Sequence, residues 1–581
     1  MNTDIENLFK DKVLGHPAGL FVLFFTEMWE RFSYYGMRAL LVMFFTASLL
    51  DEGWGWPREY AFAIFGTYTS MVYLATLLGG YLSDRKIGFR YAILIGALLM
   101  TLGHACMALE TQFFIYTGLV LLVFGSGFFK PNMTSIISAM YASRPEKKDG
   151  AYTIFYMGVN AGAFLGILLC GYMGEQVGWS WGFGLAGIFM LFGLLQFWLS
   201  QDIFGSIGLK PKKQDEQIEL GPDEPKLNPF TKFQIGIIAL SSIIGLAWMI
   251  NDPVSKISQG AYNLFDFSVG SLSGPSFMIL LALGLFILLL VIRLPRYDKI
   301  TKDRMFAVMF FSFVTIFFWA IFEQAPSSLT IFARDYTDRI LEGNSALIFK
   351  VVDALVTIIP LGVITWVLFK LFGKTFTRFK WSNIILGLSF VIIWAIALFR
   401  LSDKFSQDVA EIDASWFGIL NSLFIITFAP LFSRWWESKY NPNANMKYAI
   451  GMFLLGLGMA CVAVGASEIP AGAKTASVSI IWLVLVYFFH TMGELCISPV
   501  ALSYVSKLVP GRMIAIMFGV YYLAVAIGMK LAGVFGEASE EIARTEGLSS
   551  FFWLLTFIAF GLAVFSALMY PVIKKLMHGV R

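Results

Sequence analysis

The chain has 581 residues, of which 57% are hydrophobic and only 14% are charged. Soluble globular proteins carry about 25% charged residues, so this composition excludes an ordinary soluble protein and indicates one that spans a membrane. The net charge of +4 comes from lysines and arginines between the apolar segments, so it does not point to nucleic acid as a partner.

Apolar runs of about 18 residues or more recur along the chain, and none shows the alternation of a membrane β-barrel strand. We therefore predict an all-α polytopic membrane protein with about 16 spans. In chain order these are 18–50, 59–83, 90–109, 112–141, 150–172, 178–200, 233–251, 276–293, 305–333, 345–373, 381–401, 413–433, 447–465, 477–507, 511–535 and 549–575. Prolines flank or interrupt 233–251 and 345–373, so fourteen spans is the alternative.

The first predicted span carries the sequence EMWERFSYYG from Glu27 to Gly36. One ionisable side chain costs about 2.5–3.5 kcal/mol at the centre of a membrane helix, so several in one span require partners or water. At about 100° per residue, one side of the helix would carry its polar residues, namely Glu27, Glu30, Arg31, Tyr34 and Arg38. We infer that this polar stripe faces something other than lipid and serves a function.

The segment from Gly79 to Arg90, GGYLSDRKIGFR, joins the second and third spans. It resembles the loop motif of the major facilitator superfamily, whose glycines permit close helix packing and whose Asp/Arg pair can close the cytoplasmic mouth. An ordinary basic loop is the alternative.

The segment from Tyr152 to Gly166, YTIFYMGVNAGAFLG, combines small residues at close-packing spacing with one amide, Asn160. A buried amide needs hydrogen-bond partners, which either a bound peptide or a neighbouring helix could supply. Ligand contact and helix–helix contact are therefore both open for Asn160.

Three other spans each carry a lone charge: Lys130, Glu323 and Glu494. Each requires an opposite charge, a ligand or a proton. The first half of the chain supplies the cations Arg38 and Lys130, and the second half supplies the two glutamates. Ion pairs between the halves that form and break during a transport cycle are predicted, with static buried ion pairs as the alternative.

A polar stretch from Gln201 to Lys232 separates six spans from the rest and is typical of a linker. This arrangement resembles the major facilitator fold of two six-helix bundles, in which substrate binds between halves that rock to alternate access. An even number of spans puts both termini on the same side of the membrane. The loops on that side are rich in lysine and arginine, which predicts that it is the cytoplasmic side. The predicted division is an N-terminal bundle 1–200, a linker with an inserted helix pair 201–304, the first helix of the C-terminal bundle 305–333, a second inserted pair 334–412, and the rest of that bundle 413–581.

Taken together, several motifs resemble the proton-dependent oligopeptide transporter family of the major facilitator superfamily. They are ExxERFxYYG at Glu27–Gly36, the FYxxxNxGxxxG run around Asn160, FEQ at 322–324, ASWFGILNSLFIITFAPLFSRWW at 414–436 and GELCISP at 493–499. They are spread over both halves in order, which makes the resemblance more specific than any single motif.

The resemblance implies roles for the intramembrane residues. Proton coupling would rest on Glu27, Glu30, Arg31 and Glu323, with protonation of a glutamate releasing Arg31 toward substrate. An outer gate would pair Arg38 with Glu323, and an inner gate Lys130 with Glu494. The residues expected to bind substrate are Arg31, Tyr34, Tyr35, Tyr73, Lys130, Asn160, Asn421 and Glu494.

The implied function is proton-coupled symport of di- and tripeptides across the inner membrane of a bacterial cell, by a monomer without metal or cofactor. A peptide is a zwitterion, so a cavity with cations on one side and carboxylates on the other could hold both ends. One alternative keeps the fold but carries nitrate or an amino-acid derivative. Another is a peptide sensor without transport. A membrane enzyme is disfavoured, because the sequence has no metal cluster, nucleophile elbow or phosphate loop.

Some features depart from the family pattern. Bacterial members often carry the first inserted pair, 233–251 and 276–293, but the second pair, 345–373 and 381–401, is unexpected. We expect it to serve peripheral packing or assembly. His490 lies one turn before Glu494, and an imidazole held between helices is the expected reading of it.

Overall fold

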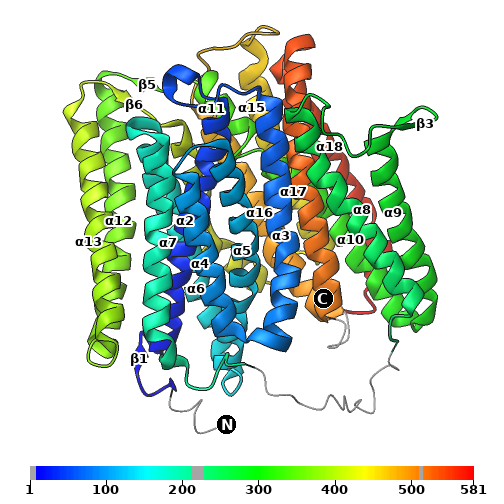
Figure 1. Ribbon diagram of the computed structural model, residues 1–581, viewed down its shortest axis with the longest axis horizontal. Helices are drawn as coiled ribbons and strands as arrows, with labels where there is room; N and C mark the ends of the chain where they lie inside the picture. The colour runs from blue at the N-terminus through cyan, green and yellow to red at the C-terminus, as the bar shows by residue number, and fades with distance from the viewer. Residues whose placement is uncertain (1–7, 211–227, 509–513, 581) are drawn as a thin grey trace.

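The computed structural model describes residues 8–210, 228–508 and 514–580. Long helices run side by side across the molecule (Figure 1). They are α2 (Ala18–Thr46), α3 (Arg58–Leu82), α4 (Phe89–Met107), α5 (Gln112–Met140), α6 (Lys148–Tyr172), α7 (Trp179–Ser200), α8 (Lys232–Ile257), α9 (Gly274–Arg293), α10 (Lys299–Phe322), α11 (Ser328–Asp335), α12 (Gly343–Thr375), α13 (Lys380–Ser406), α14 (Ile419–Glu437), α15 (Ala444–Gly465), α16 (Ile481–Leu508), α17 (Ile514–Thr545), α18 (Leu548–Leu568) and α19 (Tyr570–Leu576).

Three two-stranded antiparallel ribbons lie at the ends of helices. They are β1 (Lys12–Val13) with β2 (His16–Pro17), β3 (Ser268–Val269) with β4 (Leu272–Ser273), and β5 (Ile340–Leu341) with β6 (Ala410–Glu411). The C-terminus and β1 lie at the same end of the long helices (Figure 1). We call this end the terminal face and the opposite end the far face.

The prediction of about sixteen spans is confirmed, because each predicted segment contains a long helix within the described residues. Among the described residues, 15 helices are long and apolar enough to cross a membrane. The sixteenth is α2, which is 29 residues long but carries the four ionisable side chains of the polar stripe. The two proline-containing segments are also helical, since α8 continues through Pro253 and α12 through Pro360.

One predicted span is broken in the structure. The segment 305–333 was expected to be continuous, but α10 ends at Phe322 and α11 begins at Ser328. Pro326 explains the break, because its ring clashes with the carbonyl four residues earlier and it lacks the N–H of a helical residue. Glu323 consequently lies at the end of α10, where its side chain reaches the molecular interior.

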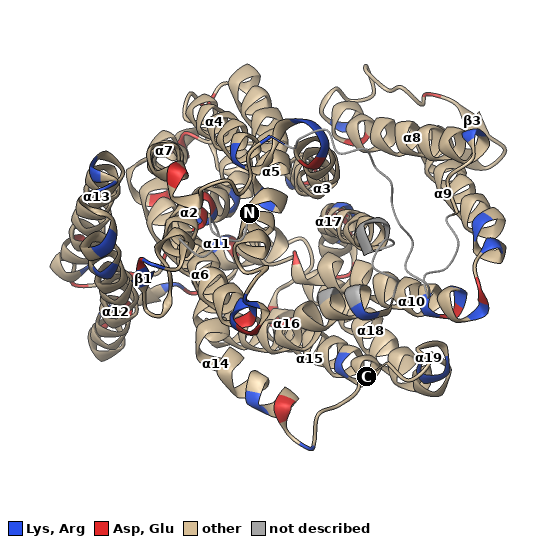
Figure 2. Cartoon of the chain, turned by 90° about the horizontal axis from the view of Figure 1, so that it is seen from below, with Lys and Arg blue, Asp and Glu red and all other residues tan. Residues whose placement is uncertain are grey.

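The helices form two bundles with an inserted pair outside each. Helices α2 to α7 pack together, as do α10 and α14 to α18, and the short α11 contacts the turn Ala414–Gly418 before α14. Seen from the terminal face in Figure 2, α8 and α9 lie beside α3 at one side, whereas α12 and α13 lie beside α7 at the other. The core of a major facilitator fold is therefore kept, and both insertions are peripheral.

The bundles meet closely where α3 of the first packs on α17 of the second. A Cβ atom added to Gly66 would lie 2.8 Å from the Cα of Gly533, so only glycine fits there. Toward the far face, the Arg58 guanidinium of α3 forms ion pairs with Asp335 at 2.7 Å and Glu540 at 3.2 Å. No ion pair joins the bundles near the terminal face among the residues that the structure describes.

The loop motif after α3 differs in part from its expected role. Gly79 packs directly against the backbone of Gly127, as close helix approach requires. Arg90 does not pair with an acid but donates to the carbonyl oxygens of Gly205 and, at 2.6 Å, Ile207. It thereby fixes the chain that leaves α7. No ion pair of Asp84 occurs in the described parts of the chain, so an Asp/Arg latch at this mouth stays a prediction.

The second inserted pair is attached by buried charges. The Arg400 guanidinium of α13 contacts the Asp353 carboxylate of α12 at 2.8 and 2.9 Å, and the two side chains are 0% and 1% exposed. Trp416, just before α14, donates its indole N–H to the same carboxylate at 2.7 Å. This pair of helices is therefore bound to the core by specific polar contacts rather than by apolar packing alone.

Candidate functional site

The polar stripe of α2 forms a compact ion cluster. The Arg31 Nε atom lies 2.7 Å from Glu27 Oε1 and 2.8 Å from Glu30 Oε2. Glu27 precedes Arg31 by one helical turn, which is the spacing that brings two helical side chains together. All three side chains are buried, so each charge depends on its partners for stabilisation.

A second ion pair connects the two bundles. Arg38 Nη1 of α2 lies 2.9 Å from Glu323 Oε2 at the end of α10. The same nitrogen is 3.2 Å from Glu323 Oε1, so the guanidinium faces both carboxylate oxygens. The predicted partners Arg38 and Glu323 are thus in contact, and their role as a gate stays a prediction.

Tyr34 stands at the centre of three cations. Its ring centroid is 6.0 Å from Arg31 Cζ, 5.6 Å from Arg38 Cζ and 4.3 Å from the Lys130 ammonium of α5. The Lys130 ammonium is also 5.2 Å from the ring of Tyr73 on α3. Aromatic faces attract cations, so the two tyrosines stabilise positive charge in this part of the first bundle.

Glu494 lies on the other side of the site, on α16. Asn421 of α14 donates its amide to Glu494 Oε2 at 2.9 Å and to Thr491 Oγ1 at 3.1 Å. Within the described ranges, neither Lys130 nor Glu494 forms an ion pair, and the two are not in contact with each other. The expected pairing of Lys130 with Glu494 therefore stays a prediction.

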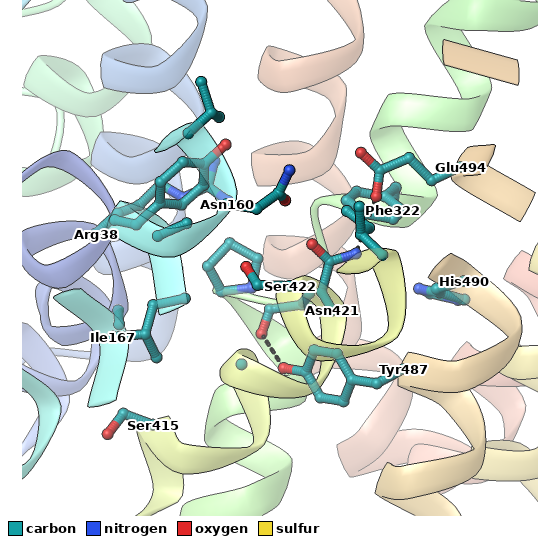
Figure 3. Close-up of a pocket in the computed structure, with 18 of the residues that line it drawn as sticks. Arg38, Asn160, Ile167, Phe322, Ser415, Asn421, Ser422, Tyr487, His490 and Glu494 are labelled. Carbon is teal, nitrogen blue, oxygen red and sulfur yellow. Dashed lines mark hydrogen bonds between the residues drawn. The ribbon is translucent and has the colours of Figure 1, made fainter. Parts of the chain in front are cut away.

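A cavity lies between the bundles at the level of these charges (Figure 3). Five of the predicted site residues line it: Tyr35, Arg38, Asn160, Asn421 and Glu494. The other predicted residues are not part of the lining; they lie on α2, α3 and α5 and directly after α10, namely Glu27, Glu30, Arg31, Tyr34, Tyr73, Lys130 and Glu323. Asn160 donates to the Tyr156 carbonyl of its own helix at 3.0 Å, which leaves its amide oxygen available.

Two residues that line the cavity, Tyr487 and His490, were not predicted from the sequence to do so. Tyr487 lines the cavity and donates its hydroxyl to the Ala325 carbonyl at 3.3 Å, an interaction drawn in Figure 3. His490, expected to be held between helices, does stack on Phe322, but it lines the cavity as well. Both precede Glu494 on one face of α16, by two turns and one turn, so the helical period starting from Glu494 could have indicated them.

The comparisons with known proteins fit this geometry. The model of the POT family matches residues 90–220 and 389–554. A peptide transporter of Yersinia enterocolitica, YePEPT, is 31% identical over 90% of this chain and 88% of its own length. The chain belongs to the POT family.

Other relatives of this POT family member agree in length as well as in sequence. The uncharacterized transporter YclF of Bacillus subtilis is 30% identical over 97% of this chain and 96% of its own. A di-/tripeptide transporter of Lactococcus lactis is 28% identical over 92% of this chain and 93% of its own. The match therefore covers both bundles.

Solved structures give the same result for the fold. The crystal structure of a peptide transporter POT in complex with alafosfalin superposes with a TM-score of 0.70 at 27% identity, covering 100% of this chain and 99% of that one. A POT family transporter in complex with a thioalcohol-conjugated peptide superposes with a TM-score of 0.70 at 25% identity, covering 98% and 100%. This POT protein is thus a multi-pass membrane protein with the architecture of the family.

Proposed function

We propose that the protein is a proton-coupled symporter that carries di- and tripeptides by alternating access. It would act as a monomer in the inner membrane of a bacterial cell, with the terminal face in the cytoplasm. The named functions of its relatives support this proposal. The observation that carries it is the separation of two charges that form no ion pair with any described residue, Lys130 in the first bundle and Glu494 in the second.

This charge arrangement suits a short zwitterion. The carboxylate of a peptide would be attracted to Lys130 and Arg31, and its ammonium to Glu494. Asn160 and Asn421 could hydrogen-bond to the peptide backbone between these ends. The tyrosines of the lining, including Tyr35, would contact side chains of varied shape.

Proton coupling would use the cluster on α2. A proton on Glu27 or Glu30 removes one of the two negative charges that hold Arg31. Arg31 could then turn from its own helix toward the peptide carboxylate. Glu323 would act likewise, since its protonation would weaken the contact with Arg38 across the bundles.

The contacts correspond to one state of an alternating-access cycle. Arg38 and Glu323 are paired and the far face is tied by Arg58, while Lys130 and Glu494 are apart. We interpret this as a state closed toward the far face. The opposite state would separate Arg38 from Glu323 and join Lys130 to Glu494, with the segments 1–200 and 413–581 rocking against each other.

Uptake of labelled dialanine into proteoliposomes tests the proposal. Purified protein should accumulate dialanine under an imposed inward proton gradient and stop when a protonophore is added. Competition by unlabelled nitrate or an amino-acid derivative, rather than by peptides, would indicate a different cargo. Binding of dialanine by well-folded protein without accumulation would favour the sensor and overturn the symport proposal.

Replacing Asn421 by alanine should weaken peptide recognition. The carboxylate of Glu494 would lose its amide donor, and a hydrogen bond to a charged group contributes about 1.5–3 kcal/mol. We expect the apparent KM for dialanine to rise about tenfold or more. Asn441→Ala, at an exposed position, is the matched control and should leave KM unchanged. An unaltered KM in Asn421→Ala would exclude Asn421 from the binding site.

A further inference from the structure

A glutamate outside the predicted site joins the two bundles at the far face. The chain leaves α6 through a short turn, Met173–Val177, which carries Glu175. Its Oε2 atom accepts a hydrogen bond from the backbone N–H of Ala414 at 2.7 Å. Its Oε1 atom accepts from the Ser415 backbone N–H at 2.9 Å and from the Ser415 hydroxyl at 2.5 Å. All three donors belong to the second bundle.

The three donors belong to the first turn of a helix. Residues Ala414–Gly418 form a 3-10 turn that continues directly into α14. The first N–H groups of a helix have no partner within it, and a carboxylate there is favoured by hydrogen bonding and by the helix dipole. Such a cap normally comes from the residue just before the helix. Here it comes from the opposite bundle.

The residue at the usual capping position is occupied elsewhere. Asp413 makes no side-chain cap of this turn. Its carboxylate instead accepts from the Gln176 amide at 2.9 Å and from the Lys404 ammonium of α13 at 2.8 Å. The start of this helix therefore depends on Glu175 for its side-chain cap.

The capped turn leads into the wall of the cavity. Ser415 and Gly418 of the turn line the cavity, as do Asn421 and Ser422 one turn further on (Figure 3). Asn421 in turn holds Glu494. The position of Glu175 at the far face is thus connected to the cavity wall by one continuous helix.

The first and second bundles are in close contact where α6 meets the turn Ala414–Gly418, and we call this contact the seam. A Cβ atom added to Gly171 would lie 2.8 Å from the Ser415 Cβ, so α6 and the turn approach as closely as glycine allows. The second inserted pair binds both sides of the same seam. Lys404 pairs with Asp413 of the second bundle, and Asp403 accepts from the Tyr172 hydroxyl of the first at 2.8 Å.

We propose that Glu175 is a positioning residue of the transport cycle. It caps the start of the cavity-lining helix α14 across the bundle interface while the far face is closed, and it must release this helix when the far face opens. The second inserted helix pair binds a residue beside each half of this contact, Tyr172 of the first bundle through Asp403 and Asp413 of the second through Lys404. The proposal rests on the alternating access of the proposed function, but not on the identity of the cargo.

Glu175→Gln tests this directly. A glutamine side chain keeps the size but offers one oxygen, and its NH₂ group would face backbone N–H donors. Loss of the cap should favour the state in which the far face is open. Glu52→Gln, at an exposed position in the loop after α2, removes the same charge near the same face and is the matched control.

Pairs of spin labels at the far face measure the opening. Exposed Gln112 at the start of α5 and exposed Lys474 between α15 and α16 suit this purpose, in a variant without the four native cysteines. The ratio of long to short distances should rise about tenfold in Glu175→Gln and stay unchanged in Glu52→Gln. A distance distribution identical to that of the parent would overturn the proposal.

Two milder variants keep the test valid if Glu175→Gln does not fold. Ser415→Ala removes one of the three donors and should shift the distances in the same direction by a smaller amount. Gly171→Ala should separate the same surfaces by a steric route. A lack of shift in both well-folded variants would also refute the role of this contact. These measurements need neither peptide nor proton gradient, so they stand apart from the uptake assay.

Discussion

A Glu27→Gln substitution is expected to abolish proton-driven accumulation of dialanine and to leave peptide exchange across the membrane intact. Glutamine cannot gain or lose the proton whose arrival would release Arg31, yet it preserves the shape of the side chain. The initial rate of gradient-driven uptake should fall on the order of 100-fold, because the proton no longer biases the cycle. Exchange between labelled and unlabelled dialanine at equal pH needs no such bias and should continue.

Glu59→Gln provides the control for this experiment. Glu59 is an exposed glutamate at the start of α3, so its substitution removes the same charge without touching the ion cluster. It should leave both uptake and exchange unchanged. If Glu27→Gln accumulated dialanine at the rate of the parent protein, Glu27 would not be the coupling residue. If it lost uptake and exchange together, the substitution would have damaged binding rather than coupling.

The sequence predicted the ion cluster because its physical basis is local. Glu27, Glu30 and Arg31 belong to one helix, and the unfavourable free energy of burying them makes a shared cluster almost obligatory. Charge balance between the halves predicted ion pairs between them, and the family resemblance implied the specific contact of Arg38 with Glu323. Glu323 is a lone charge in an apolar segment, so it requires a partner from elsewhere in the chain.

Other features depend on information that a single sequence does not hold. The break at Pro326 was missed because a membrane helix often tolerates a proline, as α5, α12 and α16 do here. Glu175 was missed because its partners are more than 200 residues away along the chain. The proposed pairing of Lys130 with Glu494 would belong to another state of the cycle, so one structure cannot display both proposed gates.

The sequence predicted the two helices of the second inserted pair, but it did not predict how they are attached to the rest of the protein. Asp353 and Arg400 lie within the predicted spans 345–373 and 381–401, and Lys404 follows the second, but the sequence alone does not indicate a partner for any of them. In the structure they are buried and paired. Buried charges are strongly unfavourable unless they are paired. The effect of removing one of these charges on the free energy of unfolding can therefore be predicted.

Replacing Arg400 by methionine should destabilise the protein strongly. The substitution keeps most of the side-chain volume but leaves the Asp353 carboxylate buried with only the Trp416 indole as donor. Removing one partner of a buried ion pair costs about 3–5 kcal/mol of unfolding free energy. We expect a clear drop in the midpoint of thermal unfolding in detergent, together with a loosened contact between α12 and α13.

A matched substitution separates this effect from the general loss of an arginine. Arg378 lies exposed at the tip of the same hairpin, so Arg378→Met should change the unfolding free energy by about 0.5 kcal/mol or less. The double variant Asp353→Leu with Arg400→Met removes both charges and should recover most of the loss, because an apolar pair can replace a buried ion pair. Recovery should be incomplete, since the Trp416 N–H would then lack its acceptor. A double variant no more stable than Arg400→Met alone would show that the hairpin is held by Trp416 rather than by the ion pair.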